Sequence, residues 1–212
     1  MNATSDESAV WSVAADQRAG RPLLVLLHGR GGHERDMTQF FGRLPSTYVA
    51  VSVRAPRPDS PGFSWLRDME SEPSLARRLD DAAIGLLQWV AAARGDAPFV
   101  GLLGWSQGGA VALQALRIAP EVPAFVVTLG GFSGASDQAD DASLLLLRPP
   151  VFWGRGDADD VIPADDVALL GEFLKSHSRL TEVVYLGVGH EIPDAGIEDV
   201  RKFLDSLRLS DR

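Results

Sequence analysis

The sequence predicts a mostly parallel, doubly wound α/β sheet with helices on both faces, and two observations carry this prediction. Short apolar runs alternate along the chain with longer amphipathic stretches, as expected of repeated strand–helix units. Most of the short runs are continuously apolar, which is typical of strands in a sheet covered on both sides. A chain of 212 residues with 45% hydrophobic content can bury one good core, so we expect a single domain over residues 1–212.

The individual elements follow from the same patterns. The predicted strands are Val10–Val13, Leu23–Leu27, Tyr48–Val53, Phe99–Leu103, Phe125–Leu129, Val151–Trp153 and Glu182–Leu186. The predicted helices are Asp36–Leu44, Ser74–Arg94, Gln107–Ala119, Asp165–Ser176 and Ile197–Leu207. The clearest period is that of Ser74–Arg94, whose apolar residues recur every three or four positions and form one stripe. Two proline- or glycine-containing stretches, Arg54–Pro73 and Gly130–Pro150, are predicted as long loops.

Charge and composition exclude several classes of function. The formal net charge is −9 without a long run of like charges, which disfavours nucleic acid or an anionic membrane as partner. The chain has no Cys, so a thiolate nucleophile and thiolate metal ligands are ruled out. The first twenty residues lack the pattern of a secretory signal, and no apolar run approaches the roughly 20 residues of a membrane span. We therefore expect a cytoplasmic protein without stable membrane insertion, with residues 1–8 disordered and a homodimer left open.

A glycine-flanked serine stands between a predicted strand and a predicted helix, in Gly104-Trp105-Ser106-Gln107-Gly108-Gly109. Alone, a G-x-S-x-G match is weak, because a chain this rich in glycine contains one by chance roughly one time in ten. The strand before it and the helix after it predict a sharp turn with strained backbone angles at the serine. Such a turn exposes the hydroxyl and places a helix N-terminus beside developing negative charge. We expect Ser106 to be a nucleophile; the alternative is a plain glycine-rich turn.

A serine hydroxyl is a poor nucleophile until a base takes its proton, so a histidine is needed as well. Of the four in the chain, His190 directly follows the last predicted strand. We expect it to be the base, the alternative being a surface-loop histidine. His177 closes a polar helix end, where it complements the helix dipole, and His33 lies in a polar loop without a predicted partner.

An acid must hold the imidazole in the correct tautomer, and it comes between the serine and the histidine along the chain. Residues 151–163 supply it, after a strand and before a helix. Three acids compete there, namely Asp157, Asp159 and Asp160. Asp157 is alternatively a cap of the turn, and Asp160 a solvated loop acid. The residues alone leave the choice open.

A second glycine-rich segment, His28-Gly29-Arg30-Gly31-Gly32, follows the predicted strand Leu23–Leu27. The serine turn supplies one donor to an oxyanion, the backbone N–H of Gln107. The second must come from a loop after an early strand, where glycines let the backbone approach the substrate. We assign it to the N–H of Arg30, the alternative being a plain glycine-rich turn. His28 is expected to brace this loop by hydrogen bonds.

Four motifs together resemble the phospholipase/carboxylesterase family, which has the α/β-hydrolase fold and contains bacterial carboxylesterases and acyl-protein thioesterases. They are His28-Gly29-x-Gly31, Gly104-x-Ser106-Gln107-Gly108-Gly109, Gly156-x-x-Asp159-x-x-Ile162-Pro163 and Gly189-His190. The resemblance runs from about Pro22 to Leu207, in the family's order and spacing. It implies that Asp159, three residues before the Ile-Pro pair, is the acid. It also implies that Phe63-Ser64-Trp65 lies at the mouth of the active site, with Phe63 and Trp65 in the substrate pocket.

Two positions depart from the family pattern. Arg30 stands where the family usually has an apolar residue, which weakens the expectation of a long acyl chain. Arg155-Gly156 replaces a His-Gly pair, which concerns only the packing of that loop. The resemblance otherwise implies a small-molecule ester as substrate, without a cofactor. No metal is expected, because no H-E-x-x-H or comparable ligand spacing occurs.

The sequence thus predicts a serine carboxylic-ester hydrolase that works through an acyl-enzyme. The interval from Ser106 to Asp159 is too short for a cap domain, so we expect an open site and short or medium acyl groups. The alternatives are an acyl thioesterase or lysophospholipase of the same family, and a ligand-binding protein that keeps the fold without turnover. An aspartate-dependent dehalogenase or epoxide hydrolase is disfavoured, because Ser106 occupies the nucleophile position.

Overall fold

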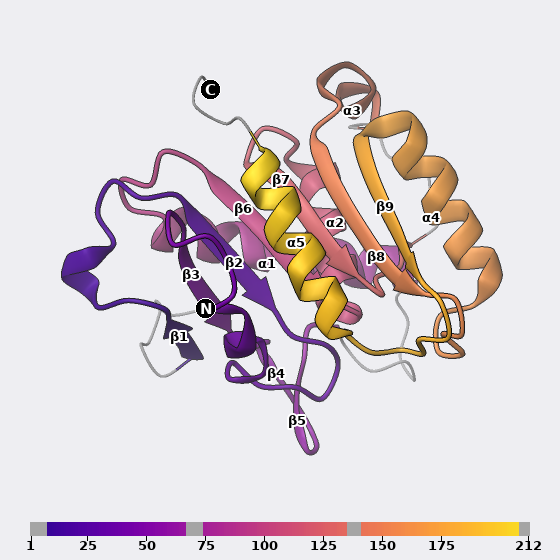
Figure 1. The fold of residues 1–212 in the computed structure, drawn as a ribbon, viewed down its shortest axis with the longest axis horizontal. Helices are drawn as coiled ribbons and strands as arrows, with labels where there is room; N and C mark the ends of the chain where they lie inside the picture. Colours follow the sequence, from indigo (N-terminus) through magenta and orange to yellow (C-terminus); the bar gives the residue numbers. More distant parts are fainter. Residues whose placement is uncertain (1–7, 67–73, 135–140, 208–212) are drawn as a thin grey trace.

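The computed structural model describes residues 8–66, 74–134 and 141–207. Its centre is a seven-stranded sheet in the order β1-β3-β2-β6-β7-β8-β9 (Figure 1). The strands are β1 (Ala9–Trp11), β2 (Leu23–Leu27), β3 (Val49–Val53), β6 (Val100–Trp105), β7 (Pro123–Leu129), β8 (Pro150–Gly156) and β9 (Arg179–Tyr185). Strand β1 pairs antiparallel with β3, whereas the other described pairs of this sheet are parallel. The predicted mostly parallel sheet is confirmed.

Helices cover both faces of the sheet. They are α1 (Leu75–Ala93), α2 (Gln107–Ile118), α3 (Asp141–Leu147), α4 (Ala164–His177) and α5 (Asp194–Ser206), with short 3₁₀ helices η2 (Ala15–Gln17) and η3 (Asp36–Phe40). Figure 1 shows α5 in front of the sheet and α1 and α2 behind it. One hydrophobic core accordingly lies between the sheet and α1, α2 and α4, and a second between the sheet and η3 and α5.

The burial of the elements explains why their sequences look as they do. All five residues of β2 and of β3 are buried, because helices cover both sides of these strands. Helix α1 buries Leu79, Ala83, Leu86 and Val90 along the predicted stripe. Each fully buried aliphatic side chain of this kind contributes about 1.5–3 kcal/mol to folding. Strand β9 lies at the edge of the sheet and is mostly exposed.

Three segments differ from the sequence prediction in their kind of secondary structure, whereas the bounds of the other predicted elements shift by at most three residues. The loop predicted over Arg54–Pro73 contains a small hairpin of β4 (Arg57–Asp59) and β5 (Gly62–Ser64), and residues 67–73 lie outside the described part. The loop predicted over Gly130–Pro150 contains α3, and residues 135–140 likewise lie outside it. The helix predicted over Asp36–Leu44 is instead the shorter η3. Three-residue strands that include a proline, and a helix of two turns, are too short for hydrophobic periodicity to reveal.

Two further predictions concern the N-terminal residues and the crossing of a membrane. Residues 1–7, expected to be disordered, lie outside the described residues. Ser8, included in that expectation, is among the described residues, and its carbonyl accepts a 2.8 Å hydrogen bond from the Arg54 N–H. Among the described residues, no helix combines the length and apolar character that crossing a lipid bilayer demands. No separate cap domain covers the sheet within the described ranges.

Candidate active site

Ser106 occupies a strained turn at the carboxyl end of β6. The strand ends at Trp105 and helix α2 begins at Gln107, so a single residue reverses the chain. Ser106 has φ 52° and ψ −120°, a conformation rarely adopted by a residue with a side chain. The turn is so tight that a Cβ at Gly104 would collide with the carbonyl oxygen of Gly108. The sharp, glycine-dependent turn predicted from the sequence is therefore present.

His190 joins Ser106 to Asp159. Its Nε2 lies 2.8 Å from the Ser106 Oγ, and its Nδ1 lies 2.7 Å from Oδ2 of Asp159. The three residues follow β6, β8 and β9, whose carboxyl ends meet at one edge of the sheet because the strands are parallel. A proton on Nδ1 satisfies the carboxylate and leaves Nε2 as the acceptor for the serine proton. The arrangement can activate the hydroxyl.

Hydrogen bonds keep Asp159 ionised. Burial raises the pKa of its carboxyl, but hydrogen bonds from His190 and from the Val161 and Ile162 N–H groups outweigh burial and hold it below its usual value. The two backbone donors contact Oδ1 at 2.9 and 3.1 Å, which leaves Oδ2 for the imidazole. The carboxylate is thereby fixed at both oxygens.

The other two acids of this loop face elsewhere. Oδ1 of Asp157 accepts a 2.6 Å hydrogen bond from the Gly187 N–H, so this residue ties the loop after β8 to the loop after β9. Asp160 is exposed. Of the three candidates, the structure brings only Asp159 to the imidazole.

His28 braces the loop that carries Arg30. The Ala55 N–H donates to Nε2 of His28 at 3.0 Å, so the ring proton resides on Nδ1, which donates to the Gly29 carbonyl at 2.7 Å. Burial lowers the pKa of His28, which keeps the ring neutral. The Gly29 carbonyl and the Arg30 N–H belong to one planar peptide group and point in opposite directions. By holding the carbonyl, His28 sets the direction of that N–H, so the predicted brace is present.

Ser106, Gln107 and Arg30 line one cleft of about 380 Å³. Its other lining residues are Ser64, Leu66, Leu75, Arg78, Phe132, Val161, Ile162, Pro163 and Asp166. The N–H of Gln107 belongs to the first turn of α2, where no intrahelical acceptor is available. The Arg30 side chain is 63% exposed, and its Nε donates to Oδ2 of Asp59 at 2.8 Å. Its charge is thus partly balanced at the entrance.

Phe63 and Trp65, which were predicted to lie in the substrate pocket, are not among the described residues that line this cleft. Trp65 is only 4% exposed and belongs to the hydrophobic core that α1, α2 and α4 cover. The Phe63 ring contacts the guanidinium of Arg54 at 4.8 Å and lies edge-on to His33 at 5.3 Å. Ser64 lines the cleft, and Phe63, the preceding residue of β5, points to the opposite face because successive side chains of a strand alternate.

The sequence analysis did not identify several residues that line the cleft, although the position of some of them could have been inferred from the sequence. Ile162 and Pro163 come three and four residues after Asp159 in the same segment, so their presence in the cleft follows from the position of the acid. Leu75 lies in the first turn of α1, after an undescribed segment, and Phe132 follows the carboxyl end of β7. Nothing in the local sequence marks these two as cleft residues.

Comparison with known proteins supports the resemblance. A family model described as phospholipase/carboxylesterase matches residues 88–208, more than half of the chain. The chain belongs to the phospholipase/carboxylesterase family.

Individual relatives of this family are similar along much of the chain. A putative esterase, NocK, of Nocardia uniformis subsp. tsuyamanensis is 30% identical over 155 residues, which cover 70% of this chain and 43% of NocK. The chain therefore spans less than half the length of that relative. Acyl-protein thioesterase 1 of Saccharomyces cerevisiae is 24% identical over 91% of this chain and 95% of its own. The crystal structure of the Bacillus cereus carboxylesterase shares the fold, with a TM-score of 0.77 at 18% identity, covering 93% of this chain and 92% of that one.

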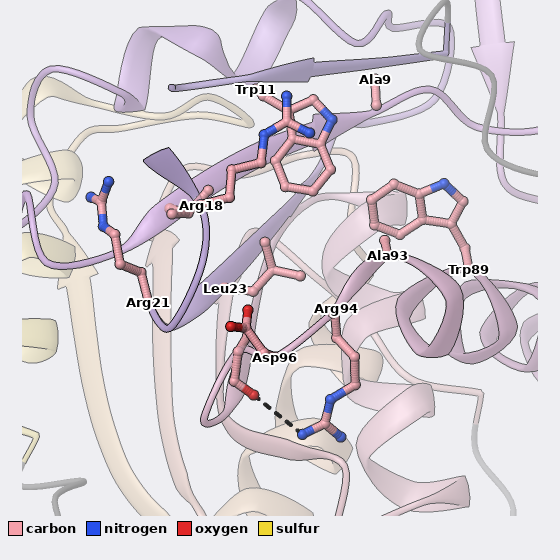
Figure 2. Close-up of a pocket in the computed structure, with 12 residues that line it drawn as sticks. Ala9, Trp11, Arg18, Arg21, Leu23, Trp89, Ala93, Arg94 and Asp96 are labelled. Carbon is pink, nitrogen blue, oxygen red and sulfur yellow. Dashed lines mark hydrogen bonds between the residues drawn. The ribbon is translucent and has the colours of Figure 1, made fainter. Parts of the chain in front are cut away.

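A second hollow lies at the opposite end of the sheet from the Ser106 cleft. It has a volume of about 260 Å³ and is lined by Trp11, Trp89, Arg18, Arg94 and Asp96 among others (Figure 2). None of its described lining residues is a serine, threonine or histidine. A nucleophile–base pair is therefore found only at the Ser106 cleft of the two.

The remaining histidine of interest lies away from both hollows. His177 is the last residue of α4, where its ring stacks on Phe173 at 4.3 Å and its Nδ1 lies 2.9 Å from the Phe173 carbonyl. The predicted place at a helix end is present, but the ring is partly buried on the aromatic side chain.

An ion pair beside the His28 loop makes the free energy of unfolding depend on pH in the acid range. Arg54 binds both oxygens of the buried Glu34, at 2.6 and 2.8 Å, and this hydrogen bonding lowers the Glu34 pKa to about 2. Since the pKa is lower in the folded than in the unfolded chain, the stabilisation is present above the unfolded value and is lost as pH falls toward 2. We expect Glu34→Gln to lower the free energy of unfolding at pH 7 by on the order of 1–3 kcal/mol.

Denaturant unfolding of both proteins at pH 7, 4 and 2.5 measures this effect. The difference between wild type and Glu34→Gln should shrink as the pH falls. A difference that stays constant over this range would show that the Glu34 carboxylate is not the titrating group. The exposed Glu191 offers a matched Glu→Gln control.

Proposed function

We propose that this protein is a serine hydrolase of carboxylic esters that acts through an acyl-enzyme. The observation that supports it most is the single imidazole placed between the Ser106 hydroxyl and the Asp159 carboxylate at 2.8 and 2.7 Å. Membership of a family that includes esterases and thioesterases adds independent support.

The first half of the reaction forms the acyl-enzyme. His190 takes the Ser106 proton as Oγ attacks the ester carbonyl carbon. The carbonyl oxygen becomes an oxyanion, which accepts hydrogen bonds from the N–H groups of Arg30 and Gln107. The imidazolium, stabilised by Asp159, then protonates the leaving alcohol as the carbon–oxygen bond breaks, and the acyl group remains on Ser106.

The second half returns the enzyme to its starting state. His190 removes a proton from water, and the resulting hydroxide equivalent attacks the acyl carbon of the Ser106 ester. A second oxyanion is held by the same two N–H groups. Its collapse releases the carboxylic acid and returns the proton to the Ser106 oxygen. Because the His190 imidazolium protonates the leaving group, the thiol of a thioester can leave in the same way as an alcohol.

The alternatives differ in leaving group and in turnover. An acyl thioesterase would favour a thioester over the matched oxygen ester, and a lysophospholipase would favour a glycerophospholipid ester. A binding protein would retain the cleft but release no product. Steady-state assays of matched oxygen esters and thioesters, with a lysophospholipid, discriminate between these functions. Failure of the purified protein to hydrolyse any activated ester would overturn the proposal.

The form of the cleft favours short or medium acyl groups. Its volume of about 380 Å³ lies near the lower end of the range for small-molecule sites. Half of its lining residues are apolar, among them Leu66, Leu75 and Ile162, and they share the cleft with charged Arg30 and Asp166, so a short or medium acyl group already fills the apolar part. Within the described residues no cap covers it.

This gives a prediction on p-nitrophenyl esters from acetate to palmitate. Each methylene that enters the apolar part contributes about 0.8 kcal/mol, so kcat/KM should rise about fourfold per methylene and then level off. We expect the maximum at short or medium length and no increase in rate at the micelle threshold. A maximum at palmitate, or a jump in rate above that threshold, would contradict the open, short cleft.

A further inference from the structure

We propose that Trp65 is a positioning residue that couples the two halves of the oxyanion hole. The inference rests on the proposed function, since it concerns the N–H groups of Arg30 and Gln107. Three sets of contacts carry it. They connect the Gln107 side chain to the Trp65 backbone, the Trp65 indole to the His28 carbonyl, and β5 to the glycines that follow Arg30.

The first contact lies on the side of the nucleophile. Oε1 of Gln107 accepts hydrogen bonds from the Trp65 N–H at 2.7 Å and from the Ser64 hydroxyl at 3.0 Å. Gln107, Ser64 and Trp65 are all at least nine-tenths buried. The residue whose backbone N–H faces the cleft is therefore tied by its own side chain to the end of β5.

The second contact lies on the side of the loop. The indole Nε1–H of Trp65 donates to the His28 carbonyl at 2.8 Å, and the two rings lie 5.4 Å apart. His28 in turn holds the Gly29 carbonyl, whose peptide group carries the Arg30 N–H. A continuous path of buried hydrogen bonds thus runs from Gln107 through Trp65 to the peptide that bears the second donor.

The third set of contacts pairs β5 with the glycine loop through backbone hydrogen bonds. The Gly31 N–H donates to the Phe63 carbonyl at 2.8 Å, and the Phe63 N–H donates to the Gly32 carbonyl at 2.9 Å. The approach is so close that a Cβ at Gly62 would overlap the carbonyl oxygen of Gly31. The segment 62–65 is therefore the brace of the glycine loop.

Such a brace is needed because the loop is rich in glycine. Gly29, Gly31 and Gly32 flank Arg30, and an unsupported glycine chain samples many conformations. Oxyanion donors are effective when they are held in place before the charge develops, within about 0.5 Å of the productive geometry. Trp65 supplies this order to both donors at once.

The coupling has a kinetic signature. The oxyanion forms only in the transition state, so a misplaced donor lowers kcat while leaving KM nearly unchanged. We expect Trp65→Phe, which removes the Nε1–H donor and keeps a large ring, to lower kcat by roughly 10–100-fold with KM within threefold. Binding of a boronic-acid transition-state analogue should weaken in proportion to kcat/KM, whereas binding of the product carboxylic acid should not change.

Trp153→Phe is the matched control. Trp153 is 1% exposed, and its Nε1 has no hydrogen-bond partner among the described residues, so the same substitution removes ring area without removing a bond. It lies on the helix side of β8, in the core that α4 covers. Its kcat should stay within about threefold of wild type. A Trp65→Phe enzyme that matches this control in kcat would overturn the coupling.

Gln107→Met gives a second, independent arm. It removes the acceptor of the Trp65 N–H and keeps the backbone donor of residue 107. Its loss in kcat and that of Trp65→Phe should combine to less than their product in the double variant, because both break one path. Losses that multiply would contradict the path. Should Trp65→Phe fail to fold, the kcat, KM and analogue binding of Gln107→Met decide alone.

Measurements on the wild type distinguish a failure of the coupling from a failure of the proposed function. If it hydrolyses esters and is labelled at Ser106 while the variants behave like Trp153→Phe, only the coupling fails. If the wild type neither turns over an ester nor reacts at Ser106, the proposed function fails and the coupling fails with it.

Discussion

Ser106→Ala is expected to lower kcat for activated esters by roughly 10⁴–10⁶-fold. The reason is that the hydroxyl is both the attacking atom and the site of the covalent intermediate. In the structure its Oγ lies 2.8 Å from Nε2 of His190, in a cleft lined by both proposed oxyanion donors. Removing the oxygen leaves only the binding and electrostatic contributions of the site, which accelerate hydrolysis weakly.

The measurement is steady-state hydrolysis by the purified variant beside a folding control. Ser176→Ala is a suitable control, because Ser176 is exposed at the end of α4 and the described hydrogen bonds of its hydroxyl are to the nearby Glu172 and Phe173 carbonyls and the His177 ring. It should keep wild-type kcat. A Ser106→Ala protein that retains most of its activity would show that another residue is the nucleophile.

Asp159→Asn is expected to lower kcat by about 10²–10⁴-fold. The Val161 and Ile162 N–H groups donate to Oδ1, so the amide oxygen of the variant remains at that position. Its NH₂ group then faces Nδ1 of His190 and favours the tautomer with the proton on Nε2. A protonated Nε2 cannot accept the proton of Ser106, so the base is lost although the ring stays in place.

Asp157→Asn and Asp160→Asn are the matched comparisons in the same loop. Asp157 accepts one backbone hydrogen bond, from the Gly187 N–H, and an amide oxygen can accept it equally. Asp160 is exposed. Both variants should keep kcat within about tenfold of wild type. If Asp157→Asn proves the most damaging of the three, the triad assignment is wrong by two residues.

Most of the fold could be predicted, because the buried parallel strands have a strong local signature. The run Leu23–Leu27 is continuously apolar, and its predicted bounds agree with those of β2. The serine turn was identifiable because a strand leads directly into the glycine-flanked Ser106 and a helix follows it at once. Strand β8 was predicted three residues too short at its carboxyl end, since Arg155 and the adjacent glycines suppress the apolar pattern.

The order of the motifs along the chain predicted that Ser106, His190 and an acid of the loop after β8 would meet, but it did not predict which acid. The choice of Asp159 over its two neighbours needed the family resemblance, since any acid in that loop satisfies the chain order. The structure adds the physical reason, the two backbone donors that orient this carboxylate. Sequence alone contained no sign of these donors.

The positions of the Phe63 and Trp65 side chains could not be read from the sequence. Their proximity to the site was predicted from the resemblance, and β5 does lie against the Arg30 loop. The face of each side chain depends on the register of a three-residue strand, which no periodicity in so short a segment reveals. Trp65 follows this strand and is buried, and its indole Nε1–H reaches the His28 carbonyl.

Peptide mapping by mass spectrometry after reaction with a fluorophosphonate tests the proposed function most directly, because the reagent modifies a serine only where a neighbouring base activates it. We predict one adduct per chain, on the peptide that contains Ser106, with modification suppressed in Asp159→Asn and absent in Ser106→Ala. An adduct on a different serine, or no adduct on a protein that hydrolyses esters, would contradict Ser106 as the nucleophile.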